Sequence, residues 1–234
     1  QQVALWFLDR LNPGQPTYNI PCALRIAGPL DTAALAQAVT RLGRRHRILA
    51  CRYIVAGGVP LIDDAGLDLT LQTADLRFLG ADAAATAADM AREEARAPFD
   101  LGTGPAARFR LVRLAPDSAV LLITLHHIAA DGWTAGLLLR ELEELYRATV
   151  EQRDPALPQL SIDYGDFALW QGGVLRGDTF AAMIAAWKDH LGDTSGELQW
   201  GRPRAATTGE GRHLPVRLDE AATRPEETRE PSPG

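Results

Sequence analysis

The apolar run Ala119–Leu125 constrains the fold of this chain more than any other segment. It has the length of a strand, and no polar face alternates along it, so we expect it to be buried on both faces inside a sheet. A second strand-like segment, 106–115, precedes it. The Pro116-Asp117 dipeptide between the two segments is a turn signal, so together they predict a β-hairpin.

A helix is predicted directly after this hairpin, over 133–150. Its apolar positions Leu138, Leu142 and Leu145 recur with helical spacing and predict the face that packs on the core. We expect the charged residues of this helix to form a solvated outer face; these are Arg140, Glu141 and Glu144.

The remaining elements follow from periodicity and from turn residues. We expect a helical segment over 1–11, a strand over 18–28, a helix from the N-cap Asp31 to about His46, two or three short strands between 50 and 74, a helix over 80–96, and a helical stretch over 163–192 with a break near Gly172-Gly173. Helices packed on a mixed β-sheet make this an α+β fold.

Composition excludes several classes of function. Of the 234 residues, 46% are hydrophobic and 23% charged, which is typical of a globular protein. The net charge of −6 argues against nucleic acid or an anionic membrane as a partner. No apolar stretch reaches the length of about 20 residues that spans a membrane, so we expect a cytoplasmic protein. Cys22 and Cys51 stand in no metal-binding spacing, and we expect no metal site.

The chain divides by composition near Gly201. Residues 1–201 hold the predicted elements, whereas 202–234 are rich in Pro, Gly, Thr, Arg and Glu and carry few large apolar side chains. We expect 202–234 to be extended or poorly ordered, with 213–218 as one strand-like segment. The chain opens without a Met on an already periodic apolar segment, so we interpret it as a piece of a longer protein.

The candidate chemistry lies at the end of the buried strand, where His126 and His127 precede the predicted helix. Adjacent strand residues point to opposite faces, so the two rings should diverge and a shared metal ion is not expected. One ring should pack in the core and the other should face a cleft. An imidazole there could take a proton from an attacking amine, hold that amine, or stabilise developing charge, and the residue type does not separate these roles.

Asp131 and Gly132 follow three residues later. Asp131 stands just before a helix and could cap it, or it could be a buried carboxylate that needs a positive partner. We expect Gly132 to permit a tight turn. His46, further upstream, is more typical of a structural histidine than of a base.

The order His126-His127-x-x-x-Asp131-Gly132 resembles the signature motif of the chloramphenicol acetyltransferase-like superfamily. With Trp133 and Thr134 after it, the stretch resembles more closely the condensation domains of nonribosomal peptide synthetases. Further segments resemble this family in the same order: 2–8, 18–21, 45–49, 98–101 with 104–105, and 163–171.

The resemblance implies a fold and a role. Condensation domains are pairs of acetyltransferase-like lobes, and this chain would be the N-terminal lobe, with the second lobe absent and 202–234 leading into it. Their donor and acceptor substrates arrive as thioesters on the phosphopantetheine arms of carrier-protein domains, within a larger synthetase. The family's catalytic histidine maps to His127. His126, Asp131, Gly132 and Trp133 map to supporting positions, with no cofactor bound directly.

The chain departs from the family pattern at the second motif. The family pairs the Asp at position 131 with an arginine of that motif, but Ala50 occupies the arginine position here. Arg47 occupies the position of the family's Glu, and Cys51 that of its Thr. Arg47 or Arg52 could replace the missing partner, although Arg52 would point to the other face of a strand.

Three functions remain open at this stage. The first is amide formation between a carrier-bound acyl group and a carrier-bound aminoacyl group, with weak or no activity for this lobe alone. The second is epimerisation or ester formation by an enzyme of the same superfamily. The third is a non-catalytic module that interacts with carrier proteins.

Overall fold

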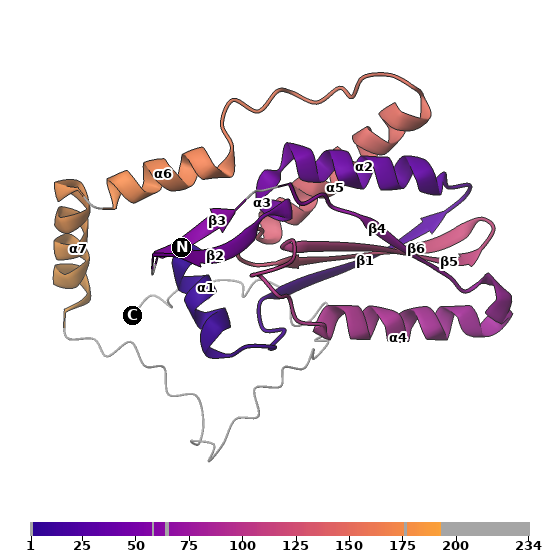
Figure 1. Cartoon of the computed structure of the whole chain (residues 1–234), viewed down its shortest axis with the longest axis horizontal. Helices are drawn as coiled ribbons and strands as arrows, with labels where there is room; N and C mark the ends of the chain where they lie inside the picture. The colour runs from indigo at the N-terminus through magenta and orange to yellow at the C-terminus, as the bar shows by residue number, and fades with distance from the viewer. Residues whose placement is uncertain (1, 58, 64–65, 176, 193–234) are drawn as a thin grey trace, which may run out of the picture. The chain divides into compact units, whose positions relative to one another are not determined.

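A computed structural model describes residues 2–57, 59–63, 66–175 and 177–192 (Figure 1). The strands are β1 (Asn19–Ala27), β2 (Arg52–Ala56), β3 (Val59–Asp63), β4 (Leu71–Asp75), β5 (Ala107–Ala115) and β6 (Ser118–His126). The helices are α1 (Gln2–Leu11), α2 (Thr32–Arg45), α3 (Arg47–Ala50), the 3-10 helix η1 (Arg77–Asp82), α4 (Ala83–Arg96), α5 (Gly132–Val150), α6 (Tyr164–Val174) and α7 (Asp178–Leu191).

The main sheet has the strand order β1-β6-β5-β4. β6 is antiparallel to both of its neighbours, and β4 is parallel to β5, so the predicted mixed sheet is confirmed. β5 and β6 form the predicted hairpin, which turns at Pro116-Asp117. The central position of β6 explains its apolar sequence, since both faces need cover. A separate antiparallel pair, β2 and β3, stands beside this sheet.

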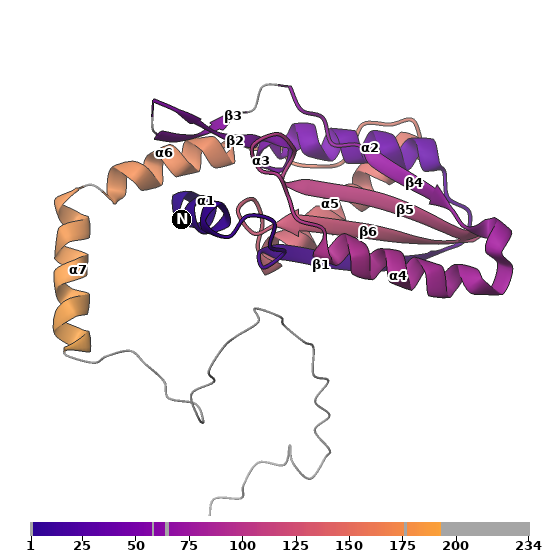
Figure 2. The same cartoon turned by 60° about the horizontal axis from the view of Figure 1, so that its bottom comes forward.

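Helices cover both faces of the main sheet (Figures 1 and 2). α2 and α5 pack together on one face, and α4 lies on the other. The larger core lies under α2 and α5, where Leu138, Leu142 and Leu145 meet Phe109 and the apolar residues of β6, as their spacing predicts. The smaller core lies under α4, around Val112 and Leu122. β6 therefore contributes to both cores, and its expected burial on both faces is confirmed.

Several boundaries differ from the expected ones. Asp31 caps α2 as predicted, and its carboxylate accepts the N–H groups of Ala33 and Ala34. His46, however, is the cap between α2 and a short helix α3 that periodicity did not predict, because α3 spans only four residues. The last helical stretch breaks near Gly172-Gly173 as predicted, since α6 ends at Val174, directly after the two glycines.

Internal contacts divide the chain into two units, Gln1–Met183 and Ile184–Gly234. The boundary expected at residue 201 and the strand expected over 213–218 lie outside the described residues. Among the helices of the described part, none combines the length and the apolar character that crossing a membrane requires.

Candidate functional site

The end of β6 separates the two adjacent histidines. His126 is only 2% exposed, and its ring lies 5.6 Å from that of Phe99 and 6.0 Å from that of Tyr18, centroid to centroid. Its Nδ1 accepts the backbone N–H of Ile128 at 3.1 Å. His127 follows the last strand residue and is exposed. The predicted divergence of the two rings is confirmed, with His126 in the core.

Burial decides the protonation state of His126. Desolvation lowers the pKa of its imidazole to about 4, with smaller contributions from His127 and Arg108. The ring is therefore neutral at physiological pH. A neutral imidazole that accepts a hydrogen bond at Nδ1 carries its proton on Nε2. This nitrogen lies 4.0 Å from Oδ1 of Asp9 in α1.

The backbone around His127 is held firmly although its side chain is exposed. The His127 N–H donates to the carbonyl of Tyr18 at 2.8 Å, which continues the β1–β6 pairing by one residue. The carbonyl of Ile128 accepts the side-chain N–H of Gln2 at 3.2 Å. The N–H of Ala129 donates to the carbonyl of His126, so the loop leaves the strand in a closed turn.

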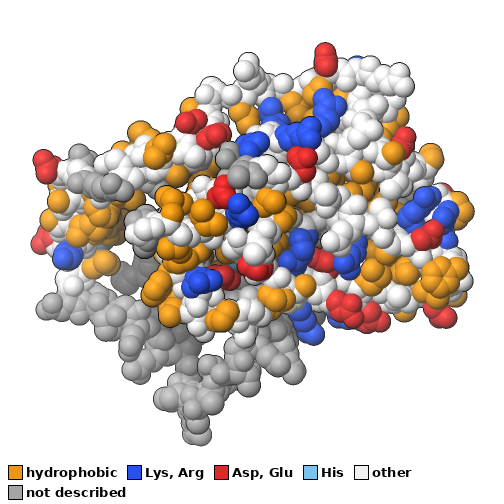
Figure 3. Space-filling model, viewed as in Figure 1, with side chains coloured by type: hydrophobic (Ala, Val, Ile, Leu, Met, Phe, Trp, Pro, Cys, Tyr) orange, Lys and Arg blue, Asp and Glu red, His pale blue; other side chains and the backbone are white. Residues whose placement is uncertain are grey.

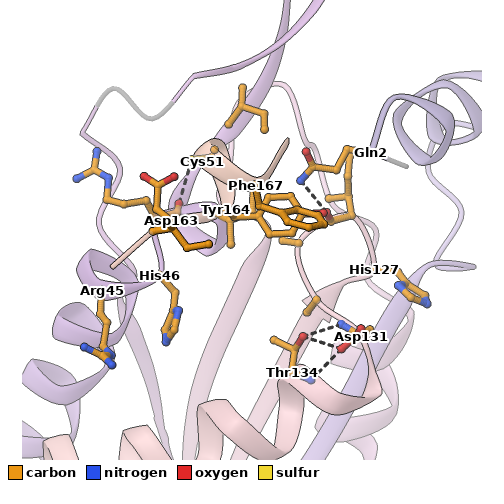
Figure 4. A pocket seen from close by; sticks show the side chains of 18 of the residues that line it. Gln2, Arg45, His46, Cys51, His127, Asp131, Thr134, Asp163, Tyr164 and Phe167 are labelled. Atoms are coloured by element: carbon orange, nitrogen blue, oxygen red, sulfur yellow. Dashed lines mark hydrogen bonds between the residues drawn. The ribbon is translucent and has the colours of Figure 1, made fainter. Parts of the chain in front are cut away.

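His127 lines a pocket of about 540 Å³ (Figure 4). Its walls come from parts of the chain that are far apart in sequence, namely α1, the junction of α2 and α3, the loop after β6, and the start of α6. In Figure 4 the His127 ring lies on the opposite side of the pocket from Arg45 and His46. The lining is more apolar than polar and includes Leu5, Ile48, Ile62, Ile128, Leu160, Ile162 and Phe167.

A buried ionic cluster forms the wall opposite His127. Oε2 of Glu141 in α5 lies 2.9 Å from Nε of Arg45 and 2.5 Å from Nε2 of His46. Arg45 also donates to the carbonyl of Pro158 at 2.7 Å. Burial raises the pKa of the Glu141 carboxyl, but the hydrogen bonds from Arg45 and His46 outweigh burial and lower it overall. Glu141 is thus a carboxylate that ties α5, α2 and the 151–163 segment together.

The placement of Glu141 corrects the sequence prediction, which put it on a solvated face. Glu141 is 6% exposed, because it follows Leu138 by three residues and precedes Leu145 by four, which places all three on one face of α5. The spacing alone contained this signal. The expectation that His46 is structural is supported by its contact with Glu141.

Asp131 is a helix cap and not a buried charge. It is exposed, and its Oδ1 accepts both the backbone N–H and the hydroxyl of Thr134, while Thr134 Oγ1 accepts the Asp131 N–H in return. These hydrogen bonds lower the pKa of the Asp131 carboxyl, and a positive charge on His127 lowers it slightly further. Arg52 pairs with Asp63 at 2.7 Å, and among the described residues no arginine forms an ion pair with Asp131.

Gly132 also differs from expectation. Gly132 is the first residue of α5 and has no positive φ, so the tight turn predicted for it is wrong. A Cβ at this position would meet no atom within 4 Å, so the space beside it is open. The Trp133 side chain is 85% exposed and covers no part of the core.

Tyr164 is a pocket residue that the sequence interpretation did not assign to the site. It is the first residue of α6, after the N-cap Asp163, and it lines the pocket beside Phe167. Burial raises the pKa of its hydroxyl, and the negative charge of Asp131 raises it further, so the group stays protonated near neutral pH. The segment 163–171 resembles a family motif, but only the tertiary fold places α6 at the pocket.

No group of three or more His, Cys, Asp or Glu side chains with the geometry of a metal site occurs within the described ranges. The polar side chains that line the pocket include those of His127, Tyr164, Arg45 and His46.

Comparisons with known proteins agree on one family. The family model for the condensation domain matches residues 1–222. A linear gramicidin synthase protein of Brevibacillus parabrevis is 42% identical over 192 residues, which cover 81% of this chain and 4% of that protein. Phosphinothricin tripeptide synthetase PhsC of Streptomyces viridochromogenes is 40% identical over 215 residues, which cover 90% of this chain and 20% of PhsC. The chain thus spans a small part of these relatives.

Solved structures share the fold. The starter condensation domain of rhizomide synthetase RzmA superposes with a TM-score of 0.76 at 22% identity, covering 83% of this chain and 47% of that one. The X-domain in its complex with OxyB from teicoplanin biosynthesis superposes with a TM-score of 0.70 at 29% identity, covering 87% of this chain and 45% of that one. The chain spans about half the length of these structures.

Proposed function

This chain belongs to the condensation domain family, and from that premise we propose that it is the catalytic N-terminal lobe of an amide-forming acyltransferase. Its substrates are an acyl group and an aminoacyl group, each held as a thioester on the phosphopantetheine arm of a carrier-protein domain in the same synthetase. His127 is the residue that acts on them.

One observation carries this proposal: of two adjacent imidazoles, His127 is exposed at a pocket while its backbone is held by hydrogen bonds. Catalysis by proton transfer needs a group that reaches the substrate and is fixed in place. His126 meets only the second requirement, since its ring is sealed in the core. The pocket of about 540 Å³ falls within the usual size of ligand pockets, roughly 300–1,000 Å³.

The reaction assigned to this site is aminolysis of a thioester. The acceptor amine attacks the thioester carbonyl carbon, a C–N bond forms, and the C–S bond breaks. His127 takes a proton from the attacking nitrogen, and that proton ends on the departing thiolate sulfur, so the enzyme is unchanged after one turnover.

The assignment is tested by measuring acyl transfer between two loaded carrier proteins. The enzyme is a complete two-lobed condensation domain with this chain as its N-terminal half, compared with the 234-residue chain alone. We expect His127→Ala to reduce transfer by about 10²- to 10⁴-fold. His190→Ala is a matched control, since His190 is an exposed histidine of α7 that does not line the pocket, and it should transfer at the unchanged rate.

The outcome that contradicts the assignment is full transfer by His127→Ala. A pH–rate profile then separates the roles of the ring. If His127 acts as a base, the rate of transfer rises with pH as the imidazole loses its proton, and this rise disappears in His127→Asn. If His127 only positions the substrate, His127→Asn keeps most of the rate.

A non-catalytic interaction module is the second candidate, and the likeness to an X-domain in complex with OxyB favours it. That function predicts that the intact domain binds carrier proteins yet forms no amide, with His127→Ala binding as tightly as the unmodified domain. Epimerisation is distinguished by its product, because it exchanges the Cα hydrogen of an aminoacyl thioester with solvent deuterium and forms no new C–N bond.

A further inference from the structure

The residue that follows His127 has both of its backbone polar groups held by side chains. The N–H of Ile128 donates to Nδ1 of His126 at 3.1 Å, and its carbonyl accepts the side-chain N–H of Gln2 at 3.2 Å. Neither bond is part of a strand or helix ladder. Because Ile128 directly follows His127, these two bonds restrain the backbone that carries the His127 ring.

Both of these restraints lead back to α1. Gln2 is a residue of α1, and Asp9 of the same helix places Oδ1 4.0 Å from Nε2 of His126, the nitrogen that carries the proton. This distance exceeds a direct hydrogen bond and fits an attraction between the carboxylate and the N–H dipole. Gln2 and Asp9 are seven residues, or two turns, apart, so they lie on the same face of the helix.

α1 is otherwise loosely attached to the lobe. None of its residues is buried, and only Leu5 and Trp6 pack against the main core as partly buried side chains. The large apolar residues on its other faces are exposed; these are Val3, Phe7, Leu8 and Leu11. Two of the polar contacts that this lightly packed helix makes are therefore directed at the His127 loop.

We propose that Gln2 and Asp9 are positioning residues for His127, and that α1 acts as a clamp on the loop that carries the catalytic ring. Gln2 holds the Ile128 carbonyl directly. Asp9 acts through His126, because it keeps the imidazole N–H pointing at α1 and leaves Nδ1 free to accept the Ile128 N–H. The catalytic part of this inference rests on the proposed function, whereas the structural part concerns the loop alone.

The structural part is tested by amide hydrogen exchange on the ¹⁵N-labelled 234-residue chain. Gln2→Met keeps the length of the side chain and removes its donor, and Asp9→Leu removes the carboxylate. We expect each to raise the exchange rate of the Ile128 amide by about 5- to 10-fold, the equivalent of one net hydrogen bond. Asp9→Glu retains the carboxylate and should stay within about twofold of the unmodified chain.

Asp89→Leu is the matched control, because Asp89 lies on α4 with an exposed side chain that pairs with Arg92. It should leave Ile128 unchanged. The clamp is refuted if Ile128 exchanges at the original rate in both Gln2→Met and Asp9→Leu. A uniform rise across the amides of β5 and β6 refutes it equally, since α1 would then stabilise the whole lobe and not the loop.

The catalytic part is tested in the two-lobed domain with carrier-bound substrates. We expect Gln2→Met and Asp9→Leu to lower kcat by about 10-fold at an unchanged KM for the acceptor carrier, and Asp9→Glu to keep most of kcat. A rise in KM at unchanged kcat contradicts a positioning role. If His127→Ala is fully active while Ile128 still loses protection in the α1 variants, the proposed function fails and the clamp on the loop stands.

Discussion

Two walls of the same pocket are built in opposite ways. On the wall formed by the loop after β6, the backbone is held and the His127 side chain is left exposed. On the wall formed by α2 and α5, the side chains are held, because Arg45 and His46 both bind the buried carboxylate of Glu141. Both walls carry a histidine, but His127 is exposed whereas His46 is partly buried and paired with a carboxylate.

The difference distinguishes the two histidines of the pocket, one held in a structural contact and one exposed. The Nε2 of His46 is bound to the buried carboxylate of Glu141, so this ring contributes to the rigidity of its wall. An imidazole at the end of a strand has both nitrogens available while its backbone stays fixed. Figure 3 shows positive and negative side chains scattered over the face that it displays.

The largest expected effect comes from His127→Ala, and it should separate activity from stability. We expect acyl transfer to fall by about 10²- to 10⁴-fold. The free energy of unfolding should change by less than about 0.5 kcal/mol, because the ring is exposed. Urea denaturation of the same sample measures the free energy of unfolding. A large loss of stability would mean that the two walls do not differ in the way described.

Glu141→Ala should show the reverse pattern. Its removal leaves Arg45 half-buried without its carboxylate, and breaking a buried ion pair costs about 3–5 kcal/mol. Glu143→Ala is the matched control, since Glu143 lies on the same helix and pairs with Arg147 at the surface, and its loss should cost about 0.5 kcal/mol or less. Equal effects of the two substitutions in urea denaturation would contradict the structural role of Glu141.

The pH dependence of stability should reveal the lowered pKa of His126. Burial lowers the pKa of its imidazole to about 4 in the folded chain, whereas an unfolded histidine titrates near pH 6.5. The stabilisation is complete above pH 6.5 and is lost as the pH falls toward 4, because only the unfolded chain binds the proton in this window.

This loss should amount to about 2 kcal/mol between pH 7 and pH 5, as measured by urea denaturation at each pH. His126→Asn offers a carbonyl oxygen in place of Nδ1 and cannot titrate there, so its stability should fall by about 2 kcal/mol less over the same range. A parallel decline in both proteins would assign the effect to other groups.

The smallest effect is expected at Asp131. Asp131→Ala removes the cap of α5 and should cost about 1 kcal/mol of stability, with Asp131→Asn costing less, because an amide oxygen still accepts the Thr134 N–H. If Asp131 were instead bound in an ion pair, Asn would cost as much as Ala. Thermal unfolding of the three proteins decides between the cap and the ion pair.

Much of the fold could be predicted because its elements carry local signals. The hairpin of β5 and β6 was marked by two strand-like segments around Pro116-Asp117, and α2 began at the expected cap, Asp31. The short helix α3 could not be predicted, because four residues contain little more than one helical period. The break in the last helical stretch was predicted, because Gly172 and Gly173 lie directly before the end of α6 at Val174.

The site was predictable in part. Strand alternation separated the two histidines, and family resemblance selected His127. The role of Asp131 stayed open, because both a cap and a buried charge suit a position before a helix. Glu141 was assigned to the wrong face even though its spacing from Leu138 places it inside. Gln2 and Tyr164 could not be assigned to the site, because their partners are more than 30 residues away in sequence.

The sequence by itself determined the strand–loop–helix unit that carries His126, His127 and Asp131, because alternation, turn residues and caps act between neighbours along the chain. Only the tertiary structure decided which charges are buried, which segments close the pocket, and that α1 reaches the peptide group after His127. These features depend on contacts between distant segments, and such contacts form only when the sheet and its helices pack together.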